Sequence, residues 1–115
     1  MENSEKTATS TEQIKEAIIK QVRSVYDPEI PVNIYDLGLI YNIEVDEKGE
    51  VDILMTFTSP ACPVAGSILN EINYRTEGID GVTDVRIKVT WDPPWDKSMA
   101  SERARIELSQ IFGDF

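Results

Sequence analysis

One short stretch fixes where a strand must end and a helix begin. Residues 58–63 have the sequence TSPACP, and they follow alternating apolar residues at Val51, Ile53, Met55 and Phe57. This alternation predicts a half-buried strand. The two prolines of the stretch have no backbone N–H to donate, so strand pairing cannot continue through them. The chain must therefore leave the sheet here.

The same stretch carries the only cysteine, Cys62. Pro63 suits the first position of a helix, which predicts a helix over 63–76 with Cys62 as its N-cap. Free backbone amides and the positive end of the helix dipole favour an anionic sulfur at that place. The alternative is a thiol packed as a small hydrophobe, the commoner fate of a lone cysteine. Position alone leaves both interpretations open and favours packing.

Composition excludes several classes of protein. The chain has no histidine, which rules out Cys-His and Ser-His-Asp arrangements and any histidine metal site within one chain, and a single cysteine rules out an intramolecular disulfide. With 21 acidic against 11 basic residues, the net charge of −10 argues against nucleic acid as the main partner. Because no apolar run is long enough to span a membrane and no targeting leader is evident, we expect a cytoplasmic protein with no membrane partner.

The remaining patterns predict one compact domain of α/β (α+β) class, over residues 11–115, after a disordered polar leader at 1–10. Ser10 and Gln13 fit a capping box ahead of a helix over 11–25. Alternation predicts strands over 39–45, 51–57 and 85–91, and Ser98 is the expected cap of a last helix that ends at Gly113. The predicted order is helix, strand, strand, helix, strand, helix, with a small mixed three-stranded sheet covered by helices.

The loop after the first helix begins with DPEIP at 27–31. Its plainer interpretation is a connector in which Asp27 and Asp36 make local turn hydrogen bonds. Asp27 and Glu29 are two residues apart in an extended segment, however, and can face one direction. Such a pair can hold a cation or a partner's basic group. The sequence alone favours the connector.

Four separated motifs can now be compared together: DPEIP at 27–31, NIYDLGLIY at 33–41, MTFTSPACP at 55–63 and WDPPW at 91–95. In this order they resemble the metal–sulfur cluster biosynthesis family, which includes bacterial SufT-type proteins and a eukaryotic cytosolic iron–sulfur assembly component and is related to PaaD-like proteins. The resemblance covers about residues 11–115. Ala61 stands where family members commonly have glycine, and the cysteine-rich tail of PaaD-like relatives is missing.

The resemblance implies a role in maturing or inserting iron–sulfur clusters, and a functional surface at the matching positions Asp27, Glu29, Thr58, Ser59 and Cys62. It also implies an accessory factor rather than an enzyme, whose partners are iron–sulfur assembly proteins and client apo-proteins. Trp91 and Trp95 are expected to be core or lid residues.

The number of cluster ligands in the chain limits the possible mechanisms. Protein-bound clusters usually take four thiolates, sometimes with histidine replacing some of them, and this chain offers one thiolate. A stable, self-contained cluster is therefore excluded. Three arrangements stay open: a cluster bridged between the protomers of a homodimer with help from small thiols, a transient handover of iron or a cluster through Cys62 as one metal ligand, or a scaffold without iron contact.

Two rival functions come from other classes. A thiol-dependent enzyme would use Cys62 as nucleophile and Asp27 or Glu29 as base, although a carboxylate is a weak base for an ordinary thiol at neutral pH. A pure interaction module would dock clients on its acidic surface and leave the cysteine as packing.

Overall fold

The structure is a computed structural model that describes residues 10–26, 32–58 and 65–113. Its elements are α2 (Thr11–Val22), β1 (Ile40–Val45), β2 (Glu50–Met55), α3 (Ala65–Glu77), β3 (Asp84–Val89), a short 3₁₀ helix (Lys97–Met99) and α4 (Glu102–Phe112). The order of helices and strands confirms the predicted one. Of the predicted leader, only Ser10 lies within the described residues.

The three strands form one mixed sheet in the order β1-β2-β3. β1 pairs antiparallel with β2, and β2 pairs parallel with β3. The hairpin turn between β1 and β2 is held by the carboxylate of Asp46, which accepts hydrogen bonds from the backbone N–H groups of Lys48 and Glu50, both at 2.9 Å. A mixed sheet is what a strand–strand–helix–strand order predicts, and the structure places β2 at its centre.

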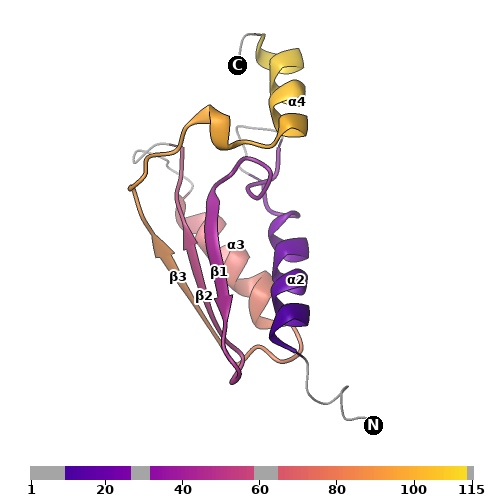
Figure 1. The fold of residues 1–115 in the computed structure, drawn as a ribbon, viewed down its shortest axis with the longest axis vertical. Coiled ribbons are helices and arrows are strands. Elements are labelled where there is room, and N and C mark those ends of the chain that lie inside the picture. The colour runs from indigo at the N-terminus through magenta and orange to yellow at the C-terminus, as the bar shows by residue number, and fades with distance from the viewer. Residues whose placement is uncertain (1–9, 27–31, 59–64, 114–115) are drawn as a thin grey trace.

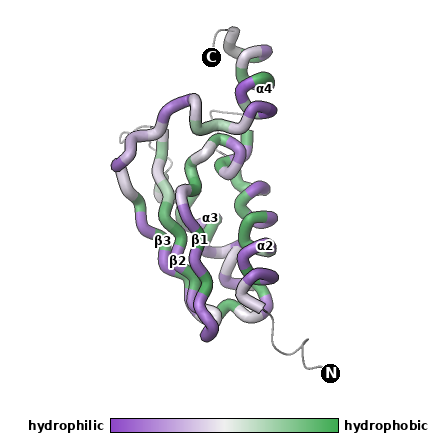
Figure 2. The backbone as a smooth tube through the Cα atoms, viewed as in Figure 1, coloured by the Kyte–Doolittle hydropathy of each residue, from purple (hydrophilic) through white to green (hydrophobic). Residues whose placement is uncertain are grey.

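Helices α2 and α3 pack on one face of the sheet, α2 beside β1 and α3 beside β3 (Figure 1). Apolar and polar residues alternate along these elements (Figure 2). The apolar residues that face the helices from β2 are buried, and so are those of the helices that meet them: Val51, Ile53, Met55, Ile14, Ile18, Val22, Ile68 and Ile72. The domain therefore has two layers around one core.

The first helix begins as predicted and ends earlier than predicted. Ser10 and Gln13 form the expected capping box, with both side-chain hydrogen bonds at 3.1 Å. The helix stops at Val22 rather than at residue 25, and the next residues form tighter turns. Val25 is buried outside the helix, and its carbonyl accepts a hydrogen bond from the N–H of Ile34. Tertiary pairing therefore ends the helix before its apolar periodicity ends.

The predicted cap of the last helix is wrong. Ser101 caps α4 by accepting a hydrogen bond from the N–H of Ala104 at 3.1 Å. Ser98 lies in the short 3₁₀ helix instead, where its N–H bonds to the carboxylate of Asp96. The predicted end is confirmed, because Gly113 closes α4 with a φ of +80°. In Figure 1, α4 lies beyond the end of the sheet at which β2 and β3 terminate.

Candidate functional site

Most of the predicted functional surface falls outside the described residues. Asp27, Glu29, Ser59 and Cys62 belong to segments 27–31 and 59–64, and so does the predicted N-cap of α3. Thr58 is described: it follows buried Phe57 just past the end of β2 and is half-buried. The described part of this region is therefore Thr58 together with the residues that bound the two segments.

A series of backbone hydrogen bonds connects the boundaries of the two segments. Tyr26 and Asn33, on either side of 27–31, form an antiparallel bridge. The N–H of Ile34 donates to Val25 at 2.9 Å, and the N–H of Leu39 donates to Ile34 at 3.1 Å. The N–H of Thr56 then donates to Leu39 at 2.9 Å. The residues flanking 27–31 are thus tied to the residues that precede 59.

The loop between these bonds is held by its own polar groups. The amide side chain of Asn33 accepts a hydrogen bond from the N–H of Asp36 at 2.8 Å and donates one to the Asp36 carboxylate at 2.9 Å. Arg23 lies 3.8 Å from that carboxylate and 4.9 Å from the ring centroid of Tyr35. The predicted turn hydrogen bonds of Asp36 are confirmed, whereas those of Asp27 lie outside the described residues.

The WDPPW segment at 91–95 docks on the same end of the sheet. The N–H of Thr90 continues the pairing beyond β3 by donating to Met55 at 2.8 Å. The indole N–H of Trp95 then donates to the carbonyl of Leu37 at 2.7 Å, and the hydroxyl of Tyr41 donates to the carbonyl of Pro93 at 2.8 Å. Three of the four sequence motifs therefore meet in the described structure.

The two tryptophans of this segment differ. Trp95 is half-buried and packs against the core, as expected of a core or lid residue. Trp91 is 45% exposed, and its ring centroid lies 6.4 Å from that of buried Phe57, close to Thr58 in sequence. An exposed indole next to the predicted functional surface is a residue type enriched in protein interfaces.

Tyr41 is a residue of this region that sequence reasoning did not single out. Burial raises the pKa of its phenol above the ordinary value of 10.0, and a hydrogen bond with the hydroxyl of Thr56 opposes that shift. The phenol is therefore protonated at neutral pH and can donate to Pro93. Its place inside the NIYDLGLIY motif was the available signal, but a strand tyrosine in such a motif reveals no partner that lies 52 residues away.

A cavity of about 460 Å³ lies between the end of α2, the loop after residue 31 and the start of α4. Its lining includes Tyr26 and Val32, which bound the segment 27–31, together with Arg23 and Arg103. Both guanidinium groups lie near carboxylates, those of Asp36 and Glu107. The cavity is therefore polar and of mixed charge.

The described residues contain no group of three or more Cys, His, Asp or Glu side chains arranged to hold a metal ion. Four of the five predicted site residues, Asp27, Glu29, Ser59 and Cys62, lie outside those ranges. Within the same ranges, no helix is long and apolar enough to cross a membrane.

Known proteins with similar sequences identify the family. The family described as iron–sulfur cluster assembly protein matches residues 15–89, which is most of the chain. The match includes three of the four motifs and ends just before the WDPPW segment.

Individual relatives agree with this match. An Fe-S protein maturation auxiliary factor of Porphyromonas gingivalis is 49% identical over 84% of this chain and 91% of its own. The Fe-S protein maturation auxiliary factor SufT of Staphylococcus aureus is 37% identical over 73% of this chain and 96% of its own. A crystal structure of a DUF59 domain from Bacillus anthracis superimposes with a TM-score of 0.81 at 32% identity, over 93% of this chain and 98% of that one. The chain therefore belongs to the iron–sulfur cluster assembly protein family, and its resemblance to SufT-type proteins is confirmed.

Proposed function

We propose that the protein matures iron–sulfur proteins by passing iron or a cluster to client apo-proteins through Cys62, while a partner supplies the remaining ligands. The observation that carries this proposal is the donor set: one cysteine and no histidine in a chain of an iron–sulfur assembly family. Since a cluster usually needs four thiolates, one chain can contribute at most one of them. The cluster is cargo that is held between two proteins.

The proposed contact surface consists of Cys62 with Asp27, Glu29, Thr58 and Ser59. The hydrogen bonds from Val25 through Ile34 and Leu39 to Thr56 support it, because they hold the boundaries of both segments on one framework. In this surface the hydroxyls of Thr58 and Ser59 donate hydrogen bonds toward the sulfur. The start of the helix favours an ionised thiol and the carboxylates of Asp27 and Glu29 oppose it, whereas bound iron would deprotonate the thiol and attract both carboxylates.

The role is that of an accessory factor rather than a catalyst. The relatives of Porphyromonas gingivalis and Staphylococcus aureus are maturation auxiliary factors, which supports this assignment. The partners are iron–sulfur assembly proteins and client apo-proteins, and we place their encounter in the cytoplasm. A thiol-dependent enzyme is the less favoured alternative, because the chain has no histidine to serve as a base for Cys62 and a carboxylate is a weak base for an ordinary thiol.

An adaptor role is the second candidate, and the exposed ring of Trp91 favours it. This indole lies against Phe57 and is 45% exposed. A client protein that covers Trp91 would be held close to the residues that precede Cys62. In the adaptor version the protein brings client and carrier together without touching iron.

Incubation of the purified protein with ferrous iron, sulfide and a small thiol that supplies the remaining ligands, under anaerobic conditions, tests the direct contact. Wild type should develop a visible absorption band that Cys62→Ala lacks, and Cys62→Ser should also lack it because a hydroxyl is a poor ligand for iron in a cluster. Circular dichroism of both variants should match wild type, which separates loss of a ligand from loss of the fold.

Complementation in cells tests the function itself. In cells that lack the native protein, activity of cluster-dependent enzymes should be restored by wild type and not by Cys62→Ala. Equal restoration by both, together with equal absence of the absorption band, would leave the adaptor role and eliminate direct contact.

A further inference from the structure

The outer edge of β3 has unpaired backbone groups. β3 is the last strand of the sheet and pairs only with β2. Among the described residues, no backbone or side-chain hydrogen bond reaches this strand from its other side. A row of free N–H and C=O groups on a straight strand is a template for pairing with another strand.

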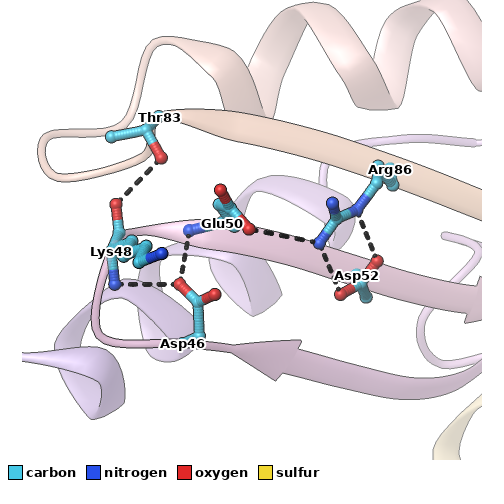
Figure 3. A network of polar contacts seen from close by, with 6 residues as sticks. All are labelled: Asp46, Lys48, Glu50, Asp52, Thr83 and Arg86. Atoms are coloured by element: carbon cyan, nitrogen blue, oxygen red, sulfur yellow. Dashed lines mark hydrogen bonds and ion pairs between the residues drawn. The ribbon is translucent and has the colours of Figure 1, made fainter.

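This edge is held rigidly at both ends. At its start, the N–H of Thr83 donates to Gly49 at 2.9 Å and its hydroxyl donates to Lys48 at 2.9 Å (Figure 3). At its end, the N–H of Thr90 donates to Met55. A strand fixed in this way loses little conformational entropy when it pairs.

The edge is also apolar on the side that faces α3. Val85 and Ile87 are only half-buried, and with Leu69, Asn70 and Asn73 of α3 they line a groove of about 230 Å³. Tyr74, one helical turn after Asn70, is 81% exposed. A strand laid along β3 would close this groove and come within reach of the tyrosine ring.

The sequence of β3 is complementary to itself in one antiparallel register. If two copies pair with Arg86 on the two-fold axis, Asp84 lies opposite Lys88 of the second copy and Val85 lies opposite its Ile87. Each interface then contains two opposite-charge pairs on the open face and two apolar pairs on the helix face. Neither Asp84 nor Lys88 has an ion pair among the described residues.

The remaining pair in that register would place two Arg86 side chains opposite each other. Each is already engaged within its own chain: its guanidinium donates to the Asp52 carboxylate at 2.8 and 3.0 Å and lies 3.6 Å from that of Glu50 (Figure 3). The two carboxylates offset the positive charge and hold the side chain over β2. Repulsion across the axis is thereby reduced.

From these observations we propose that β3 is the interface of a homodimer, in which two copies pair antiparallel about Arg86 and join their sheets into one of six strands. The two-fold axis is perpendicular to the sheet, so α3 of both copies lies on the same face. This proposal rests on the edge of β3 alone and does not depend on the role proposed for Cys62.

A charge exchange tests the register. Sedimentation velocity at about 0.15 M salt, where repulsion between chains of net charge −10 is largely screened, should show a monomer–dimer equilibrium for wild type. Asp84→Lys alone and Lys88→Glu alone each turn two attractive pairs into repulsive ones, and each should raise the dimer Kd about tenfold. The double variant restores both pairs with reversed polarity and should return the Kd to near the wild-type value.

Lys20→Glu is the matched control for Lys88→Glu. It makes the same charge change at an exposed residue of α2 and should leave the dimer Kd unchanged. Amide hydrogen exchange over 84–89 should slow as wild-type concentration rises. A wild-type chain that stays monomeric at every concentration overturns the proposal, and so does a dimer that both single variants leave intact or that the double variant fails to restore.

Discussion

At the scale of single residues, the backbone at Gly38 allows the 3₁₀ helix (Lys97–Met99) to approach the turn closely. Its φ is +85°, and a Cβ at this position would lie 2.3 Å from the carbonyl oxygen of Met99. Gly38→Ala must therefore adopt a disfavoured conformation and also displace backbone. We expect a loss of about 2 kcal/mol or more in the free energy of unfolding, measured by urea denaturation.

Gly78→Ala is the control for this measurement. Gly78 has open space around it and no positive φ, so the substitution should change stability by less than about 0.5 kcal/mol. Equal stability of the two variants would mean that Met99 does not approach the turn as closely as the structure has it.

The carboxylate of Asp46 makes the hairpin sensitive to acid. Hydrogen bonds from the N–H groups of Glu50 and Lys48 hold the pKa of Asp46 below its ordinary value of 3.8. Because the pKa is lower in the folded than in the unfolded state, the stabilisation is present above pH 3.8 and is lost as pH falls through the folded pKa. In urea melts from about pH 7 to about pH 2, the difference between wild type and Asp46→Asn should be largest near neutrality and shrink in acid.

Asp80→Asn should reproduce the wild-type dependence on pH, because the exposed side chain of Asp80 accepts no hydrogen bond from the described residues. A difference between wild type and Asp46→Asn that stays constant over the whole range would contradict the role given to the ionised carboxylate.

At the scale of elements, two side chains fasten residues 91–95 to the sheet. Trp95→Phe removes the indole donor to Leu37, and Tyr41→Phe removes the hydroxyl donor to Pro93. Each should cost about 1 kcal/mol of stability. Both bonds anchor one segment, so the double variant should lose less stability than the two single variants lose together. The expected coupling free energy is about 0.5 kcal/mol or more.

Tyr74→Phe, at a tyrosine that is 81% exposed, serves as the control and should be nearly neutral. Strict additivity of the Trp95 and Tyr41 variants would show that the two bonds do not hold the segment as a unit.

The elements also show what local sequence can predict. The capping box at Ser10 and Gln13 was recognisable because its residues are three apart and satisfy each other. Ser98 and Ser101 both suit an N-cap, and the choice between them depends on contacts far along the chain. Ser101 donates its N–H to the carbonyl of Asp36 at 2.7 Å, and neighbouring Ala100 is buried. These contacts favour Ser101 over Ser98 as the N-cap of α4.

At the scale of the whole molecule, the order of elements was predictable from the sequence. The hydrophobic repeat of a helix or strand, and the proline that ends it, depend only on residues close together in the chain. The sheet order and the free edge of β3 were not predictable, because they depend on which strands meet. Of the site, the sequence indicated Cys62, Asp27, Glu29, Thr58 and Ser59 through motifs. It did not indicate that Trp95 and Tyr41 join the 91–95 motif to the 33–41 motif. A motif does not say how far it lies in space from another motif.

The proposed function requires Cys62 to hold iron or a cluster together with a partner's ligands. The most direct test is purification of the tagged full chain from cells under strictly anaerobic conditions, with iron and sulfide analysis of each complex. We predict that wild type brings down partner proteins with iron and sulfide, and that Cys62→Ala brings down the same partners without either. Iron and sulfide in equal amounts with both proteins, or in neither, would contradict the claim.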